Sequence, residues 1–312
     1  MLELTVHRSN PLVDPSLHVW GWEIPVYLFL GGLVAGMMIL AGLALLGGRH
    51  RDPRAAYRLL PGLGLALLSA GMLALFLDLE HKLFVWRLYT TFQPTSPMSW
   101  GAWILLLVYP ALTLSLLLAP PPALARRVPA LPGLSRRLAA RPGLIRWVGT
   151  VDVALGAMLG IYTGILLSSL GARPLWNSAL LGPLFLVSGL SSAAAFAHLL
   201  SRDRTESERL LRTDNGLLAG ELALFLLFFL GLLSAARAQA EAARLFLGGP
   251  YTAVFWVLVV GAGIVIPLFL QLLAARHRIG HTAVAPLLVI AGGLALRFVI
   301  VYAGQMSHWS PL

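Results

Sequence analysis

Five polar side chains interrupt the long apolar runs of this 312-residue sequence, and all are of types that move protons or bind carbonyl oxygens. They are Glu23, Tyr27, Asp78, Tyr162 and Arg297. Polar groups are costly at membrane depth and usually have a function there. Since a helix advances about 1.5 Å per residue, counting along the runs predicts that the five reach a similar depth, near one face of a membrane. A carboxyl there can exchange protons, a phenol can donate a hydrogen bond, and a guanidinium can keep a carboxylate ionised.

Each of these residues also has a purely structural interpretation. Glu23 could cap a helix, and Asp78 could be a solvated helix end. Tyr27 could anchor the protein at the interface, as aromatic residues often do, and Tyr162 could be a phenol of the core. Arg297 is harder to explain in this way, because a guanidinium buried alone requires a partner. We expect Asp78 or Glu23 to be its counter-ion, in a functional site or in a structural ion pair.

Two further acids, Asp152 and Glu221, lie about five residues into their apolar runs, near the other face of the membrane. Buried carboxyls can relay protons, so one hypothesis is that these two begin a proton route from the cytoplasm. The alternative is that both are helix-end residues without a function.

Aromatic residues gather in the loops on the same side as the first five residues. Trp100 and Trp176, with the adjacent Asn177, belong to two such loops. Tryptophan commonly anchors membrane proteins at the interface, but these loops also suit the wall of a site for a flat, apolar ligand that carries carbonyl oxygens. A quinone ring fits this description, because it needs hydrogen-bond donors and exchanges protons with redox. We therefore predict that these three residues, with Tyr27 and Tyr162, contact a quinone.

The composition excludes several other functions. Hydrophobic residues make up 58% of the chain and charged residues 12%, far from the values of a soluble domain. Cysteine is absent, which excludes disulfides, thiolate nucleophiles and Cys-ligated clusters in this chain. Of the eight histidines, only His198 is clearly inside an apolar run, so a pair of axial haem ligands is not expected. No ligand cluster predicts a metal.

The elements that position these side chains are eight apolar runs, each long enough to cross about 30 Å of hydrocarbon as a helix. They cover about residues 23–47, 57–79, 99–118, 147–170, 178–200, 216–236, 251–274 and 283–305. Backbone amides find no water in a bilayer, so each run is expected to be helical. The fold class is therefore an all-α integral membrane protein with eight transmembrane helices.

The sequence divides into three parts within a single membrane domain. Residues 1–118 hold an N-terminal periplasmic segment and the first three helices, and residues 147–312 hold the other five. Between them, residues 119–146 are rich in Pro and Arg, as expected of a connector near the cytoplasmic headgroups.

The net charge of +10 comes from residues in the loops and at the span ends, which indicates topology and not binding of nucleic acid. Sixteen of the 23 Lys and Arg residues follow the odd-numbered runs, six lie on the other side, and Arg297 is inside a run. Basic residues favour the cytoplasmic side. We therefore predict a multi-pass protein of the bacterial inner membrane, surrounded by lipid, with both termini outside.

Five segments of the sequence resemble the NrfD/PsrC family, the quinone-interacting membrane subunits of polysulfide-reductase-like and formate-dependent nitrite-reductase-like complexes. The segments are PVYLFLGGLVAG (25–36), FQPTSPMSWGAWILL (92–106), YTGILLSS (162–169), RPLWN (173–177) and LRFVIVYAG (296–304). The resemblance extends from about residue 18 to residue 305, and PTSPMSWGAW followed by PLWN is its most specific part.

The resemblance implies two four-helix bundles and a site for menaquinone or ubiquinone near the outer face, with no haem or metal in this chain. It also implies a periplasmic ferredoxin-like subunit with [4Fe–4S] clusters and a catalytic subunit, often a molybdopterin enzyme. Tyr162 matches the motif tyrosine that contacts the quinone. Polysulfide-reductase-type members have an asparagine and a histidine on the first helix, where this sequence offers Glu23 or Ile24 and Tyr27. The donor to the second carbonyl oxygen therefore stays open.

These observations lead to a hypothesis of electron exchange between membrane quinone and an iron–sulfur partner. The predicted catalytic residues are Glu23, Asp78 and Arg297: one of the acids would exchange the quinol protons, and the guanidinium would hold that acid in place. The chemistry of the terminal substrate would belong to a partner subunit. The alternative is a proton-coupled transporter with Asp78, Arg297 and Glu221 along its path, although a transporter usually has a midplane cluster on broken helices.

Overall fold

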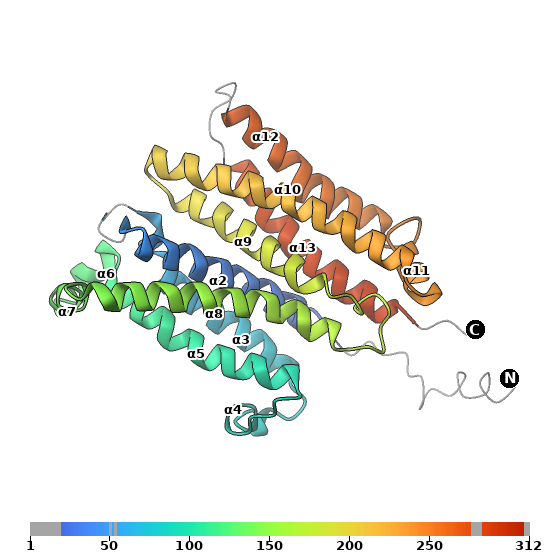
Figure 1. Ribbon diagram of the computed structural model, residues 1–312, viewed down its shortest axis with the longest axis horizontal. Coiled ribbons are helices and arrows are strands. Elements are labelled where there is room, and N and C mark those ends of the chain that lie inside the picture. The colour runs from blue at the N-terminus through green and yellow to red at the C-terminus, as the bar shows by residue number, and fades with distance from the viewer. Residues whose placement is uncertain (1–19, 50–51, 53–54, 276–282, 309–312) are drawn as a thin grey trace, which may run out of the picture.

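The computed structural model describes residues 20–49, 52, 55–275 and 283–308. The predicted periplasmic segment before residue 20 lies outside the described residues. Within the described part, all regular secondary structure is helical, and eight helices are long and apolar enough to cross a membrane (Figure 1). The predicted fold class, an all-α membrane protein with eight spans, is confirmed.

The spans agree with the apolar runs to within a few residues, with one exception. They are α2 (Glu23–Leu46), α3 (Leu60–Asp78), α5 (Pro97–Leu118), α8 (Pro142–Ser168), α9 (Leu181–Leu200), α10 (Arg204–Ser234), η4 (Val254–Val265) continued by α12 (Ile266–Ala275), and α13 (Val284–Met306). The exception is α10, which was expected to begin near residue 216. It begins 12 residues earlier because Asp203 caps it, accepting a hydrogen bond of 2.9 Å from the backbone N–H of Glu206.

Short helices occupy the connections between the spans. They are η2 (Ala56–Arg58), η3 (Lys82–Phe84), α4 (Arg87–Thr90), α6 (Pro122–Arg127), α7 (Leu131–Ala139) and α11 (Arg237–Arg244). The predicted connector 119–146 is thus largely helical, since it holds α6, α7 and the start of α8. Pro122, Pro132 and Pro142 each fall in the first two positions of a helix, where the missing amide hydrogen has no cost.

The eight spans form two groups of four. The first group contains α2, α3, α5 and α8, and the second contains α9, α10, η4 with α12, and α13. The groups meet where α2 packs on α9 and α13 and where α8 packs on α9 (Figure 1). Glycines allow the closest approach: a Cβ atom on Gly189 would lie 2.5 Å from the carbonyl oxygen of Gly32, so the two backbones are in direct contact.

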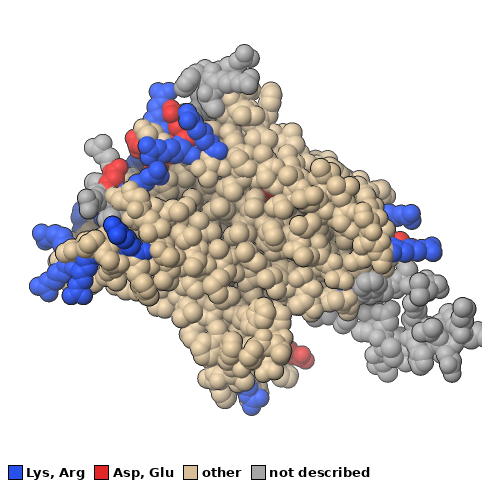
Figure 2. All heavy atoms as spheres, viewed as in Figure 1, with Lys and Arg blue, Asp and Glu red and all other residues tan. Residues whose placement is uncertain are grey.

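The two ends of the helices differ in charge. Lys and Arg side chains gather at the end that carries α6, α7 and the turn from α9 to α10, whereas few lie at the other end (Figure 2). We call these the basic end and the opposite end. On the face shown in Figure 2, the surface between the two ends is almost free of charge. Apolar side chains such as Leu226, Val257 and Phe269 are exposed. Such a surface suits lipid.

Candidate functional site

Two buried tyrosines meet near the opposite end of the first group. Tyr27 on α2 and Tyr162 on α8 lie close enough for their hydroxyl groups to interact, and both are almost fully buried. A Cβ atom on Gly101 of α5 would collide with the Tyr162 ring, and one on Gly71 of α3 would lie 3.9 Å from the Tyr27 ring. All four helices of the first group therefore converge on these two residues, which we call the tyrosine pair.

Two acids lie farther toward the opposite end than the tyrosine pair. Glu23 lies one helical turn before Tyr27 on α2, on the same face, and Asp78 is the last residue of α3. The two carboxyls interact electrostatically, and both are partly accessible. The structure therefore brings four of the five predicted residues to one end of the first group, as their depth suggested.

Arg297 is placed differently from these four. Its side chain, in the middle of α13, is fully buried. Nη1 donates to Ser188 Oγ at 2.6 Å, Nη2 donates to the carbonyl oxygen of Phe185 at 2.9 Å, and the guanidinium lies 4.6 Å from the centre of the Phe185 ring. Two residues of α9 therefore hold the guanidinium within the second group.

The acid that interacts electrostatically with Arg297 is Glu221 on α10, and our expectation of Asp78 or Glu23 was wrong. Glu221 also lies near Ser188, the residue that accepts the hydrogen bond from Arg297. The early start of α10 explains the difference, because it places Glu221 in the middle of a helix of 31 residues.

A second buried acid continues this arrangement toward the basic end. Asp214 on α10 accepts hydrogen bonds from Ser191 Oγ at 2.6 Å and from Gln271 Nε2 at 2.7 Å, and it interacts electrostatically with Glu221. Asp214 and Glu221 are seven residues apart, so they share one face of α10. We call the set Asp214, Ser191, Ser188, Glu221 and Arg297 the polar series.

Sequence reasoning missed most of the polar series, although one signal was present. Asp203 followed three residues later by Glu206 is typical of a helix start. An α10 extended back to that start would have carried Asp214 into the helix, two turns from Glu221. The serines of α9 gave no comparable signal, because small polar residues are common where membrane helices pack.

Asp152 lies in the other group of helices. It is fully buried on α8, accepts a hydrogen bond from Ser115 Oγ, and leaves its Oδ1 without a hydrogen-bond partner. Ten residues, or about 15 Å along a helix, separate Asp152 from Tyr162. The structure therefore does not bring Asp152 and Glu221 together, because they belong to different groups.

The loop residues that were predicted to form one wall of the quinone site lie in two separate places. Trp100 lies at the surface, where its indole N–H donates to the carbonyl oxygen of Pro94 at 2.7 Å. Trp176 is buried against α13: its indole donates to the carbonyl oxygen of Ile300 at 2.9 Å and stacks on Trp20. Asn177 beside it is exposed. Trp176 thus closes the opposite end of the second group, whereas Trp100 fastens the loop before α5.

The chemistry available at the tyrosine pair follows from its two hydroxyl groups. Each phenol has one O–H donor, so even if one phenol donates to the other, the second O–H stays free. The pair can therefore donate to one oxygen of a ligand, and it belongs to the same apolar cluster as Ile104 and Leu105. Glu23 and Asp78 are close enough to the opposite end to exchange protons with water.

Comparison with known proteins agrees with this architecture. The family model described as "Polysulphide reductase, NrfD" matches residues 10–308. Protein NrfD of Escherichia coli is 33% identical over 93% of this chain and 96% of its own length. The C subunit of polysulfide reductase from Wolinella succinogenes is 32% identical, over 92% and 94%, and the protein NrfD homolog of Haemophilus influenzae is 28% identical, over 97% and 99%. The protein described here therefore belongs to the polysulphide reductase, NrfD family of multi-pass membrane proteins.

Proposed function

We propose that this protein is the quinone-reactive membrane subunit of a respiratory oxidoreductase. It would exchange electrons between membrane quinone or quinol and an iron–sulfur subunit docked at the opposite end. The observation that carries the proposal is the buried tyrosine pair with Glu23 and Asp78 on its outer side. The family supports it, because one relative is named as one of the subunits of a polysulfide reductase, and that name implies a complex of several subunits.

The tyrosine pair would bind the quinone through one carbonyl oxygen, to which the free O–H donates. The second oxygen would then face Glu23 and Asp78. Oxidation of a quinol releases two protons and two electrons. The carboxyls would take the protons and pass them to water at the opposite end, and the electrons would leave to the partner. The reverse reaction would use the same groups.

The orientation and the partners are part of the same proposal. With the basic end in the cytoplasm, the tyrosine pair lies near the periplasmic face of the inner membrane, and both termini are outside. A ferredoxin-like subunit with [4Fe–4S] clusters would cover the opposite end and connect the protein to a catalytic subunit, such as a molybdopterin enzyme. Menaquinone and ubiquinone both carry the two carbonyl oxygens that the site requires.

Substitution of Tyr162 by Phe tests the proposal directly. It removes one hydroxyl of the tyrosine pair and leaves the ring that fills the space beside Gly101. We expect quinol oxidation by the purified complex in liposomes to fall about tenfold or more, since a lost hydrogen bond to a buried polar group costs about 1–3 kcal/mol. The matched control is Tyr109→Phe, which loses a hydroxyl bonded to Ser69 on the same group of helices.

Two further results decide the test. Partner subunits must still co-purify with the Tyr162→Phe variant, because a loss of assembly would also stop turnover. Unchanged turnover together with unchanged quinone affinity would overturn the assignment of the site to the tyrosine pair.

The polar series favours a second candidate function, proton-coupled transport. Asp214, Glu221 and Arg297 form a buried charged set at mid-depth, the kind of cluster that transporters use. Within a quinone-reactive subunit, the same set would instead conduct protons from the basic end. Asp152 would be a separate acid on the cytoplasmic side of the first group.

Glu221→Gln separates these possibilities when proton uptake and quinol turnover are measured in the same liposomes. Proton conduction coupled to quinone chemistry predicts that proton uptake and turnover fall together. Transport predicts that proton flux falls in liposomes without any quinone. The control is Glu208→Gln, which changes an exposed carboxyl of the same helix, paired with Arg204. If Glu221→Gln changes neither turnover nor proton flux, Glu221 has no part in proton movement.

A further inference from the structure

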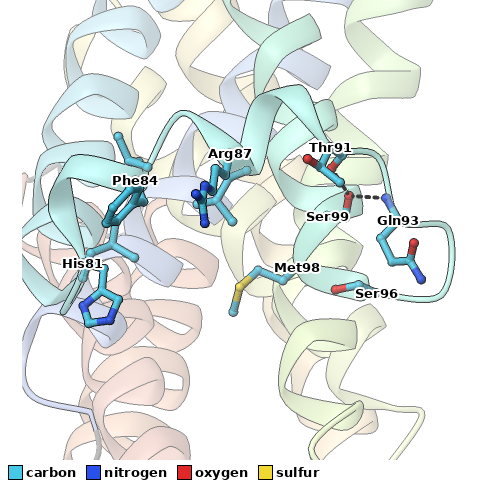
Figure 3. Close-up of a pocket in the computed structure, with 11 residues that line it drawn as sticks. His81, Phe84, Arg87, Thr91, Gln93, Ser96, Met98 and Ser99 are labelled. Atoms are coloured by element: carbon cyan, nitrogen blue, oxygen red, sulfur yellow. Dashed lines mark hydrogen bonds between the residues drawn. The ribbon is translucent and has the colours of Figure 1, made fainter.

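A cavity outside the tyrosine pair lies between the α4 segment and the first turn of α5 (Figure 3). Its volume is about 480 Å³, within the range of small-molecule sites. Most of its lining is apolar, with Arg87, His81 and Gln93 as the main hydrogen-bonding side chains. In Figure 3, Phe84 and Arg87 lie on one side of the cavity and Met98 on the other.

The surroundings of this cavity indicate that it opens toward lipid. Residues 81–93, which cover the cavity, carry exposed apolar side chains. Leu83 is 88% exposed, and Phe84, Trp86 and Phe92 are about half exposed. Aromatic and apolar residues at the ends of spans lie at the level of the lipid headgroups. Two leucines of α3, Leu73 and Leu77, are exposed one turn apart below the segment, so the apolar surface continues into the bilayer.

The cavity also adjoins the tyrosine pair. Met98 lines the cavity, and Gly101, three residues later on the same face of α5, is the residue against which the Tyr162 ring packs. Tyr89 of α4 lies near Tyr27. The distance from Met98 to Gly101 along the helix is about 4.5 Å. Met98 therefore lies within one helical turn of the residue that packs on Tyr162, and its side chain, which is unbranched, can move aside.

We propose that this cavity is the lateral portal through which quinone and quinol pass between the outer leaflet and the tyrosine pair. The inference rests on the proposed function. The ring would enter between Phe84 and Met98, while its isoprenoid tail stays along the exposed leucines of α3. Arg87 would donate a hydrogen bond to a carbonyl oxygen during entry. Its guanidinium is held in the cavity wall by the Phe84 ring, whose centre lies 4.6 Å away.

The test uses Met98→Trp, with Met158→Trp as the matched control, because Met158 is a half-exposed methionine of α8 and is not among the residues that line the cavity. Met98 is 54% exposed, so a larger side chain fits there without disturbing the core. The complex in liposomes is mixed with a long-tailed quinol, and the association and dissociation rates are measured together with the equilibrium affinity. A narrowed portal slows association and dissociation by the same factor, about tenfold, and leaves the affinity unchanged. Met158→Trp is expected to match the wild type.

The outcomes distinguish a wrong portal from a wrong function. If Tyr162→Phe weakens binding but Met98→Trp leaves both rates unchanged, the portal lies elsewhere and the quinone site stands. A Met98→Trp variant with weaker affinity and an unchanged association rate would also overturn the portal, because Met98 would then be part of the binding site. If Tyr162→Phe changes neither binding nor turnover, the proposed function itself fails.

Discussion

Arg297 and Glu221 illustrate that buried charged side chains need polar partners supplied by the protein. Three protein oxygens accept hydrogen bonds from the guanidinium, and Ser188 contacts both charged groups. Within the described residues, the Nε of Arg297 is one of a few buried side-chain nitrogens without a hydrogen-bond partner. Neither charge can be removed alone without leaving the other uncompensated in a medium that does not solvate it.

We therefore expect Glu221→Gln to destabilise the protein in detergent by about 3–5 kcal/mol, the cost of leaving one partner of a buried pair. Arg297→Gln should have a similar effect, and the double substitution should cost much less than the sum of the two. Thermal unfolding of the wild type and the three variants measures this coupling. Strictly additive effects would show that the two charges do not stabilise each other.

Gly101 is the residue whose replacement should act on the quinone site most directly. Gly101→Ala places a methyl group where the Tyr162 ring lies, so the ring must move and its position relative to Tyr27 must change. We expect quinone affinity, measured by titration of the purified complex, to fall about tenfold, as for other small shifts in a binding geometry. Gly62→Ala on α3 is the control, since its Cβ would meet only ordinary contact at 3.5 Å. Equal affinities in the two variants would contradict the role of Gly101.

At the scale of the elements, the sequence predicted the spans well because hydrocarbon leaves the backbone no alternative to a helix. It also predicted that Glu23, Tyr27, Asp78 and Tyr162 lie near one end. However, the depth of a residue in the membrane does not determine which helices surround it. Which helices neighbour each other, and which face each presents, depends on packing that an apolar run does not encode. For this reason Arg297 was assigned the wrong partner.

The helices η4 and α13 of the second group cross in close contact. A Cβ atom on Gly263 would lie 2.7 Å from the Cα atom of Gly292, so the helices touch through their backbones. We expect Gly263→Val to lower the free energy of unfolding by about 1–3 kcal/mol, the usual cost of overpacking. The control is Gly231→Val on α10, where a Cβ would meet nothing within 4 Å. Thermal unfolding of both variants measures the difference. Equal midpoints would mean that a larger side chain at Gly263 does not lower the stability of the contact between η4 and α13.

At the scale of the whole molecule, the unequal charge of the two ends predicts the orientation. The sequence has no cysteine, so single cysteines can report it. We expect Thr95→Cys, at the opposite end, to react with a membrane-impermeant maleimide in intact spheroplasts that produce this subunit without its partner subunits. Arg137→Cys on α7, at the basic end, should react only after the membrane is permeabilised. Both side chains are exposed, so burial does not bias the comparison, and the reverse pattern of labelling would invert the proposed topology.

The backbone contact between Gly32 and Gly189 has a consequence for how the molecule works. Helices that touch through their main chains have no layer of side chains on which to slide, so the two groups of helices behave as one rigid frame. Alternating access by rocking one half against the other would have to break this contact in every cycle. A rigid frame suits electron and proton transfer better than transport. In that reaction only protons, electrons and the quinone ring move, and the side chains that bind them keep fixed positions.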